Sequence, residues 1–230
     1  RYTERLMNAV QKELRLDRQP RHIECFDNSN LQGAHPVASC VVFRDGKPSR
    51  KEYRHFNIKT VTGADDYASM REVVFRRYTR LMAEGAEMPD LIIADGGKGQ
   101  MGVIHEVLEY LGLDIPVAGL AKNDRHRTSE LLCGFPPVLV GIRPTSPLFH
   151  FLAHIQEEVH RFAVSFHRQK RSKAFIHSEL EQIEGVGDKT VQTLLRHFRT
   201  VEKVRTAPAE ELSALVGPAK AKKILAYFGR

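Results

Sequence analysis

The stretch PDLIIADGG, residues 89–97, decides the fold of this chain. Its short apolar run LIIA ends at an acidic residue, Asp95, so it predicts a buried strand that ends there. Glycines then turn the chain, and a helix is expected over residues 98–111. A buried strand that leads directly into a helix indicates a domain of the α/β class.

The segments on either side of this stretch predict a mixed sheet with helices packed on it. Upstream, an Asp45-Gly46 pair predicts a hairpin turn between two strand-like runs. Early strands in a meander, followed by helices that alternate with strands, are typical of an α/β fold with a mixed sheet. The other expected strands are 22–30, 36–43, 49–58, 116–122, 129–134 and 137–142, and the other expected helices are 1–16, 67–84 and 147–167.

A change in composition near residue 168 divides the chain. The segment RQKRSKAF, residues 168–175, is strongly basic and predicts a connector between two domains. We therefore expect an α/β domain over residues 1–168, a basic linker over 169–178 and a small all-α domain over 179–230.

The expected all-α domain contains one helix pair twice. Two segments superpose at an offset of 30 residues, which matches Gly187 with Gly217 and Phe198 with Phe228. Such an internal repeat predicts two hairpins of similar structure that share one core.

A Gly-Val-Gly turn between two short helices is typical of a helix-hairpin-helix. Backbone N–H groups at the start of its second helix can hold a DNA phosphate without reading bases, and glycine allows the close approach. The alternative is a plain helical hairpin with a glycine turn. Leu215 replaces the first glycine in the second copy, which puts its phosphate contact in question. The candidate DNA contacts are Gly185, Gly187, Lys189, Thr190, Gly217 and Lys220.

The composition favours a polyanionic partner and a reducing compartment. Lys and Arg outnumber Asp and Glu by 35 to 28, and the pI is about 9.4. The three cysteines are scattered without a CxxC pair, which predicts a cytoplasmic protein without disulfides. No apolar run is long enough for a membrane span, and no signal peptide opens the chain. Since the first residue is Arg1, we expect a fragment of a longer protein.

Two acidic residues follow apolar strand-like runs, Asp27 after HIECF and Asp95 after LIIA. One alone would be an ordinary turn-former or helix cap. Two in a mixed sheet with a basic surface predict converging ligands for Mg²⁺ or Mn²⁺. Asp66 and His160 are further candidates. A helix cap is the alternative for Asp65 and Asp66, and a single helical histidine is more often structural.

The lysine among the glycines, Lys98, invites comparison with a nucleotide-binding loop. A Walker A loop requires Ser or Thr after its lysine, but here Gly99 and Gln100 follow. The Rossmann glycine pattern is also absent. The sequence therefore predicts no nucleotide-binding loop around Lys98.

The motifs IECFDNSNLQG, PVASCVVF, GADDYASM, PDLIIADGGKGQ and EEVHRFAVSFHR precede the tandem hairpins in that order. Over essentially the whole chain this pattern resembles the C-terminal half of the UvrC family, the dual-incision nucleases of bacterial nucleotide excision repair. The resemblance implies an RNase H-like domain that makes the incision 5′ to a lesion with an Asp-Asp-His metal site. It identifies Asp27, Asp95 and His160 as metal ligands and, together with Asp66, as catalytic residues.

The resemblance also implies the partners. Damaged double-stranded DNA is the expected substrate, UvrB would bind mainly through segments upstream of Arg1, and UvrA would act indirectly. The nuclease for the 3′ cut is expected upstream as well, and neither a membrane nor a small-molecule cofactor is expected. Lys98 is close enough to Asp95 in the sequence to be a candidate contact to a DNA backbone phosphate. The other candidate backbone contacts in the first domain, each with an ordinary solvated basic face as its alternative, are Lys122, Arg161, His167 and Arg168.

Three other functions stay open on the residues alone. A DNA-binding module without catalysis would have no use for carboxylates in its groove. An RNA-directed RNase H-like enzyme would differ in substrate, although the tandem hairpins favour double-stranded DNA. A small-molecule phosphohydrolase fits the hairpins and the basic connector poorly.

Overall fold

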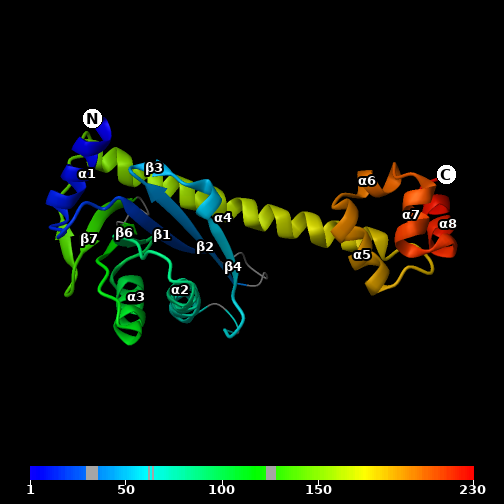
Figure 1. The fold of residues 1–230 in the computed structure, drawn as a ribbon, viewed down its shortest axis with the longest axis horizontal. Coiled ribbons are helices and arrows are strands. Elements are labelled where there is room, and N and C mark those ends of the chain that lie inside the picture. Colours follow the sequence, from blue (N-terminus) through cyan, green and yellow to red (C-terminus); the bar gives the residue numbers. More distant parts are fainter. Residues whose placement is uncertain (30–35, 62, 64, 123–127) are drawn as a thin grey trace. The chain divides into compact units, whose positions relative to one another are not determined.

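The computed structural model describes residues 1–29, 36–61, 63, 65–122 and 128–230, and for residues 29, 122, 128–129, 169–176 and 178 it describes the backbone alone. The chain forms two compact units, Arg1–Val164 and Ser165–Arg230 (Figure 1). The boundary falls within one helix, and the expected division into residues 1–168, 169–178 and 179–230 stays a prediction.

One mixed sheet forms the centre of the first unit. Its strands lie in the order β3-β2-β1-β5-β6-β7-β8, and β4 pairs with β2. The β1, β5 and β6 strands are parallel, whereas the other pairs are antiparallel, which confirms the predicted mixed sheet. The strands are β1 His22–Ser29, β2 Val37–Arg44, β3 Lys47–Pro48, β4 Arg54–Asn57, β5 Leu91–Ala94, β6 Val117–Lys122, β7 Thr128–Cys133 and β8 Val138–Val140.

Helices cover both faces of this sheet (Figure 1). Because successive strand residues point to opposite faces, Cys25 and Ile93 join the core under α1 and the first part of α4. Phe26 and Ile92 join the core under α2 and α3 on the other face. By the same alternation, the position of any later residue in β1 or β5 decides which face of the sheet its side chain points to. These helices are α1 Tyr2–Glu13, α2 Asp66–Ala83, α3 Lys98–Leu111 and α4 Pro147–Leu180.

The hairpin between β2 and β3 contains the predicted Asp-Gly turn. Asp45 has a φ of 51° and Gly46 a φ of 80°. A type I′ turn requires this left-handed backbone at both central positions, and Asp-Gly is among the pairs that adopt it readily.

The prediction of a third strand over residues 49–58 is wrong for the first half of that range. Residues Arg50–Glu52 form a short 3-10 helix, η1, and only Arg54–Asn57 pair with β2. The Arg44 guanidinium donates to the Glu52 carboxylate at 2.6 Å, which holds the chain in this turn.

The helix predicted from Pro147 to about His167 is longer than expected. It spans Pro147–Leu180 and therefore includes the segment predicted as a basic connector. The expected end at His167 is wrong because no proline or glycine follows Pro147 within this range, and charged residues alone do not end a helix.

The second unit is helical with its own apolar core. Gly187 and Gly217 are the N-caps of α5 and α8, and Leu194 and Ile224 are fully buried at matching positions. The predicted repeat is thus confirmed, whereas the short α6 between its copies was not predicted. The helices are α5 Asp188–Phe198, α6 Val201–Arg205, α7 Ala209–Val216 and α8 Pro218–Tyr227.

The three cysteines are free thiols. Burial, together with the charges of Asp95 and Asp27, raises the pKa of the Cys25 thiol well above its ordinary value, so this thiol stays protonated at neutral pH. Among the described residues, no helix combines the length and the apolar composition that a membrane crossing needs.

Candidate active site

Asp27 and Asp95 leave two neighbouring parallel strands at the same edge of the sheet. The parallel pairing of β1 with β5 ends at Phe26 and Ala94, and the N–H of Asp95 donates to the Phe26 carbonyl at 2.9 Å. Each aspartate follows that pair by one residue, so by alternation both side chains point to the face that α4 covers. Asp27 still pairs with Ser39 of β2 and therefore lies inside β1, within the strand predicted over residues 22–30.

Contacts with β4 and the residue before it fix α4 over this edge. The Tyr53 hydroxyl donates to Oε1 of Glu158 at 2.9 Å. The His55 ring stacks on the Phe162 ring with centroids 3.7 Å apart, and its Nε2 atom lies 2.8 Å from the Phe162 carbonyl oxygen. These contacts set the rotation of the helical turn that carries His160.

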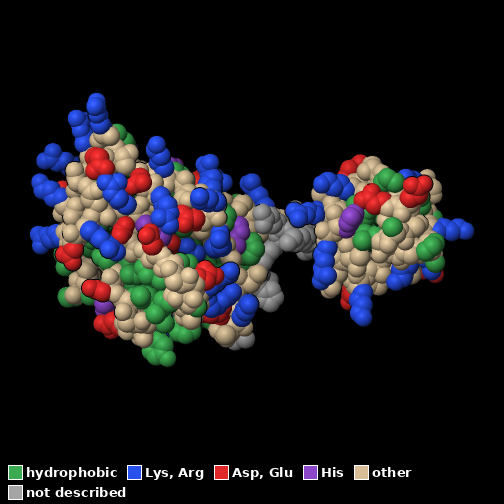
Figure 2. Space-filling model, in the orientation of Figure 1, with side chains coloured by type: hydrophobic (Ala, Val, Ile, Leu, Met, Phe, Trp, Pro, Cys, Tyr) green, Lys and Arg blue, Asp and Glu red, His purple; other side chains and the backbone are tan. Residues whose placement is uncertain are grey.

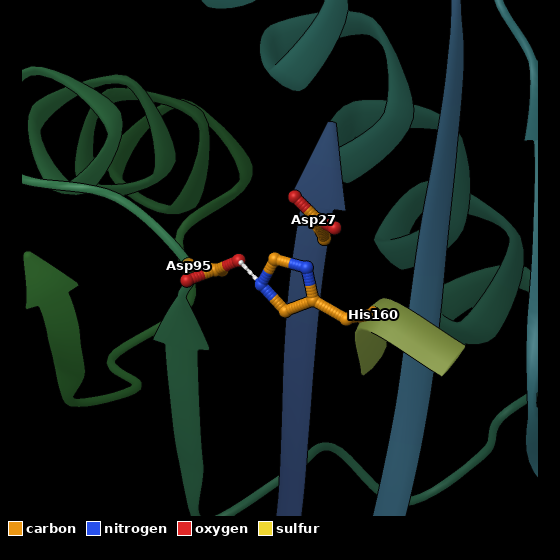
Figure 3. A group of neighbouring side chains, drawn as sticks. All are labelled: Asp27, Asp95 and His160. Atoms are coloured by element: carbon orange, nitrogen blue, oxygen red, sulfur yellow. Dashed lines mark ion pairs between the residues drawn. The ribbon is translucent and has the colours of Figure 1, made fainter. Parts of the chain in front are cut away.

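The His160 ring lies between the two carboxylates (Figure 3). Its Nε2 atom is 2.7 Å from Oδ2 of Asp95, and one ligand atom from each of Asp27, Asp95 and His160 lies within 4.8 Å of the others. Asp27 is 8% exposed and the Asp95 side chain 5%, whereas the His160 side chain is 47% exposed. The site therefore consists of two buried carboxylates with a histidine on the solvent side.

This donor set fits a hard divalent cation. Carboxylate oxygens are the ligands of Mg²⁺ and Mn²⁺, and a histidine nitrogen is compatible with Mn²⁺. Two buried carboxylates close together repel each other, and a bound cation offsets that repulsion. One other such group, His177, Glu181 and Asp188, occurs among the described residues, but its members are half-buried or exposed, and His177 lies 3.3 Å from Glu181 and 3.7 Å from Asp188.

Close packing against β6 fixes the turn that follows Asp95. A Cβ on Gly119 would lie 2.8 Å from the Gly96 carbonyl oxygen and 2.7 Å from Sδ of Met101, so only glycine fits there. Lys98 is the first residue of α3 and is exposed. The phosphate contact expected of Lys98 stays a prediction.

Asp66 is tied to the site through its backbone. It is the first residue of α2, whose N-cap is Asp65, with the Ala68 N–H donating to Oδ1 of that residue at 3.0 Å. Nδ2 of Asn28, the residue after Asp27, donates to the Asp66 carbonyl at 2.7 Å. The Asp66 carboxylate is not part of the three-residue group, and its catalytic role stays a prediction.

Gln156 is a site residue that sequence reasoning missed. It lies one helical turn before His160, and its Nε2 atom donates to Oδ1 of Asp95 at 2.8 Å. The available signal was spacing, because residues four apart on a helix share a face.

The other predicted phosphate contacts of the first domain lie in different settings. Arg161 is exposed, and its guanidinium donates to Glu158 at 2.8 Å, which lowers the pKa of that carboxyl to about 2. Arg168 is exposed, whereas His167 is buried. Lys122 ends β6, and its side chain lies outside the described residues. Figure 2 shows Lys and Arg side chains scattered over the visible surface of each unit, with Asp and Glu side chains among them.

Lysines of the second hairpin copy lie against the first hairpin. Gly185 has a φ of 81°, and a Cβ there would lie 2.5 Å from Nζ of Lys223. Thr190 is buried, and its hydroxyl accepts from Nζ of Lys220 at 3.0 Å. Lys189 is exposed. The first hairpin therefore has lysines from both copies around its turn.

The second hairpin differs in backbone conformation. Its N-cap glycine, Gly217, has a φ of 91°, whereas the matching Gly187 has a φ of −94°. The positive φ occurs two residues earlier in the first copy, at Gly185, where the second copy has Leu215. A phosphate contact at Gly217 stays a prediction.

Comparison with known proteins assigns both parts of the chain. Residues 11–164 match the UvrC RNAse H endonuclease domain, and residues 178–229 match the SAM-like helix-hairpin-helix tandem. Among solved structures, Ciona intestinalis endonuclease V in complex with DNA is 14% identical, with a TM-score of 0.35, over 55% of this chain and 63% of that chain. At that level it carries no functional argument.

Curated relatives cover nearly the whole chain. UvrABC system protein C of Bacteroides fragilis is 59% identical over 220 residues, which are 96% of this chain and 36% of that protein. UvrABC system protein C of Bacteroides thetaiotaomicron is 56% identical over 221 residues, again 96% of this chain and 36% of the relative. The chain thus spans little more than a third of the length of these relatives. With an RNase H-like domain and a helix-hairpin-helix tandem matched in order, the chain belongs to the UvrC family.

Proposed function

We propose that this chain makes the incision 5′ to a lesion in nucleotide excision repair, by metal-dependent hydrolysis of a DNA phosphodiester. The observation that carries this proposal is the convergence of Asp27, Asp95 and His160 at one edge of the sheet, in a chain of the UvrC family. The expected products are a 5′-phosphate and a 3′-hydroxyl.

The two aspartates and the histidine have different roles in the proposed site. A divalent ion, Mg²⁺ or Mn²⁺, would supply charge stabilisation for the scissile phosphate and a lower pKa for the attacking water. Asp27 and Asp95 contribute the negative charge that attracts the ion, and their burial limits the directions in which their oxygens can point. His160, on the solvent side, is placed to act as a neutral ligand or to move a proton near the substrate.

DNA would be held by contacts that do not read bases. We propose that Asp66 also takes part in the incision, because it matches the acidic residue of the family's DDYA motif; the start of α2 lies beside the residue after Asp27. The tandem hairpins would hold the backbone of double-stranded DNA through N–H groups and lysines. The further phosphate contacts that we propose in the first domain and α4 are Lys98, Lys122, Arg161, His167 and Arg168.

The wider setting is also a proposal. UvrB would bind mainly to parts of the protein outside this chain, UvrA would act through UvrB, and the whole would work in the cytoplasm. The family assignment and the free cysteines support this setting.

The test uses a full-length protein that contains this sequence, with UvrA, UvrB and an end-labelled duplex that carries one lesion. Asp95→Ala is expected to abolish the 5′ cut and to keep the 3′ cut. Glu157→Ala, at an exposed position on α4, is the matched control and should cut normally on both sides. Normal 5′ incision by Asp95→Ala would contradict the site assignment.

A further inference from the structure

Each carboxylate oxygen of Asp95 has its own partner from α4. Nε2 of Gln156 lies 2.8 Å from Oδ1, and Nε2 of His160 lies 2.7 Å from Oδ2. The two partners are four residues apart and therefore share one face of the helix. With both partners in place, the Asp95 side chain is only 5% exposed.

The chemistry of the amide fixes its orientation. An ionised carboxylate only accepts hydrogen bonds, so the amide nitrogen of Gln156 must face Asp95. His160 supplies one of the three candidate ligand atoms, and its Nε2 atom lies against Oδ2, the oxygen that Gln156 leaves open. The bond from Gln156 to Oδ1 does not compete with a cation on Oδ2, and the neutral amide removes no negative charge from the site.

The surroundings of Gln156 hold its side chain in place. It is half-buried and lines a small cavity of about 60 Å³ whose other lining residues are mostly apolar, including Leu120, Ile142, Phe149 and Leu152. Apart from Gln156, the one polar residue in the described lining is Glu130, a carboxylate that cannot donate a hydrogen bond. Losing the Gln156 amide therefore leaves Oδ1 without another side-chain donor from this wall.

We propose that Gln156 is a positioning residue, whose amide holds Oδ1 of Asp95 so that Oδ2 faces a divalent cation together with Asp27 and His160. This inference rests on the proposed function, because it assumes that these three residues hold a metal. Hydrogen bonds that orient ligating groups typically change metal affinity by about 10- to 100-fold.

Calorimetric titration of the 230-residue chain with Mn²⁺ tests this role. Gln156→Met keeps the unbranched side chain and removes the donor, and it should bind Mn²⁺ about tenfold more weakly than the wild type. Glu157→Met, at the neighbouring exposed position, should bind as the wild type does. Asp27→Ala should abolish binding and shows that the titration reports on this site.

Incision assays on the full-length protein give a second readout. Gln156→Met should raise the Mn²⁺ concentration for the half-maximal rate about tenfold and leave the rate at saturation nearly unchanged. A general structural defect would lower the saturated rate instead. If Gln156→Met does not fold, Gln156→Asn, which keeps the amide but shortens its reach, is measured with the same expectation.

The outcomes separate this inference from the proposed function. Wild-type affinity in the folded Gln156 variant, with binding lost in Asp27→Ala, would overturn the role of Gln156 and leave the proposed function standing. Absence of Mn²⁺ binding in the wild-type chain would overturn both.

Discussion

Nε2 of His160 on α4 lies 2.7 Å from Oδ2 of Asp95 at the end of β5. If this imidazole moves a proton in the reaction, His160→Ala should slow 5′ incision by about 10²- to 10⁴-fold at saturating metal. The measurement is the rate of 5′ cutting by the full-length protein. His150→Ala, at an exposed position on the same helix, is the control and should cut at the wild-type rate. A loss of less than about tenfold in His160→Ala would contradict the assigned role.

Gly119 sets the path of the chain immediately after Asp95. In Gly119→Ala the new Cβ would collide with the Gly96 carbonyl oxygen and with Met101. We expect the free energy of unfolding to fall by about 1–3 kcal/mol, as in other overpacked cores, and Mn²⁺ binding to weaken. Chemical denaturation and the calorimetric titration check the two effects.

The control for this variant is Gly102→Ala in α3, where a Cβ would meet nothing within 4 Å. It should stabilise the protein by about 0.4–1 kcal/mol, because alanine restricts the unfolded chain. Equal stability of the Gly119 and Gly102 variants would show that the turn tolerates a side chain.

Glu24 is a buried carboxylate held by three partners, Arg77, His22 and Tyr78. Burial alone would raise its pKa, but the hydrogen bonds from Arg77, His22 and Tyr78 and the charge of Arg77 together lower the pKa to about 2. The folded pKa lies below the ordinary value of 4.5. Ionised Glu24 therefore stabilises the fold above about pH 4.5, and this contribution is lost as the pH falls towards 2.

Glu24→Gln should lower the free energy of unfolding at pH 7 by on the order of 3 kcal/mol, since it leaves the buried Arg77 without its charge partner. The difference in the free energy of unfolding between wild type and variant should shrink between pH 4.5 and pH 2. Glu158, with a pKa of about 2, titrates in both proteins and therefore does not cause this change. Urea unfolding at several pH values measures this. Glu84→Gln, which breaks an exposed pair with Arg80, should cost less than about 0.5 kcal/mol. A constant difference at every pH would contradict the assignment.

Lys223 lies against the turn of the first hairpin at Gly185. If its ammonium contacts a phosphate, Lys223→Ala should weaken binding to duplex DNA and reduce the slope of log K against log salt by about 1. Fluorescence anisotropy at several salt concentrations gives this slope. Lys203→Ala, an exposed lysine on α6, should leave the slope unchanged, and identical slopes in both variants would exclude a phosphate contact by Lys223.

Local patterns predicted most of the fold. The run Leu91–Ala94 is a buried strand as expected, and Asp45-Gly46 forms the expected turn, because both depend on neighbouring residues alone. The end of α4 was predicted wrongly, because a dense run of Lys and Arg resembles a linker in composition but contains no residue that breaks a helix.

The candidate site was predictable in part. Asp27 and Asp95 follow apolar runs, and parallel pairing of their strands brings them together. Gln156 was missed because an uncharged glutamine carries no signal of its own. Its hydrogen bond to Asp95 depends on the rotation of α4. That rotation is fixed by contacts between residues far apart in the sequence, such as the hydrogen bond from Tyr53 to Glu158.

Anomalous diffraction from a crystal soaked in Mn²⁺ tests the central claim most directly. We expect a manganese peak within roughly 2.0–2.5 Å of one oxygen of Asp27, one oxygen of Asp95 and a ring nitrogen of His160. The same map should show the Gln156 amide still on Oδ1 of Asp95. A manganese ion bound at other residues, or no peak at these three in saturating Mn²⁺, would contradict the proposed metal site.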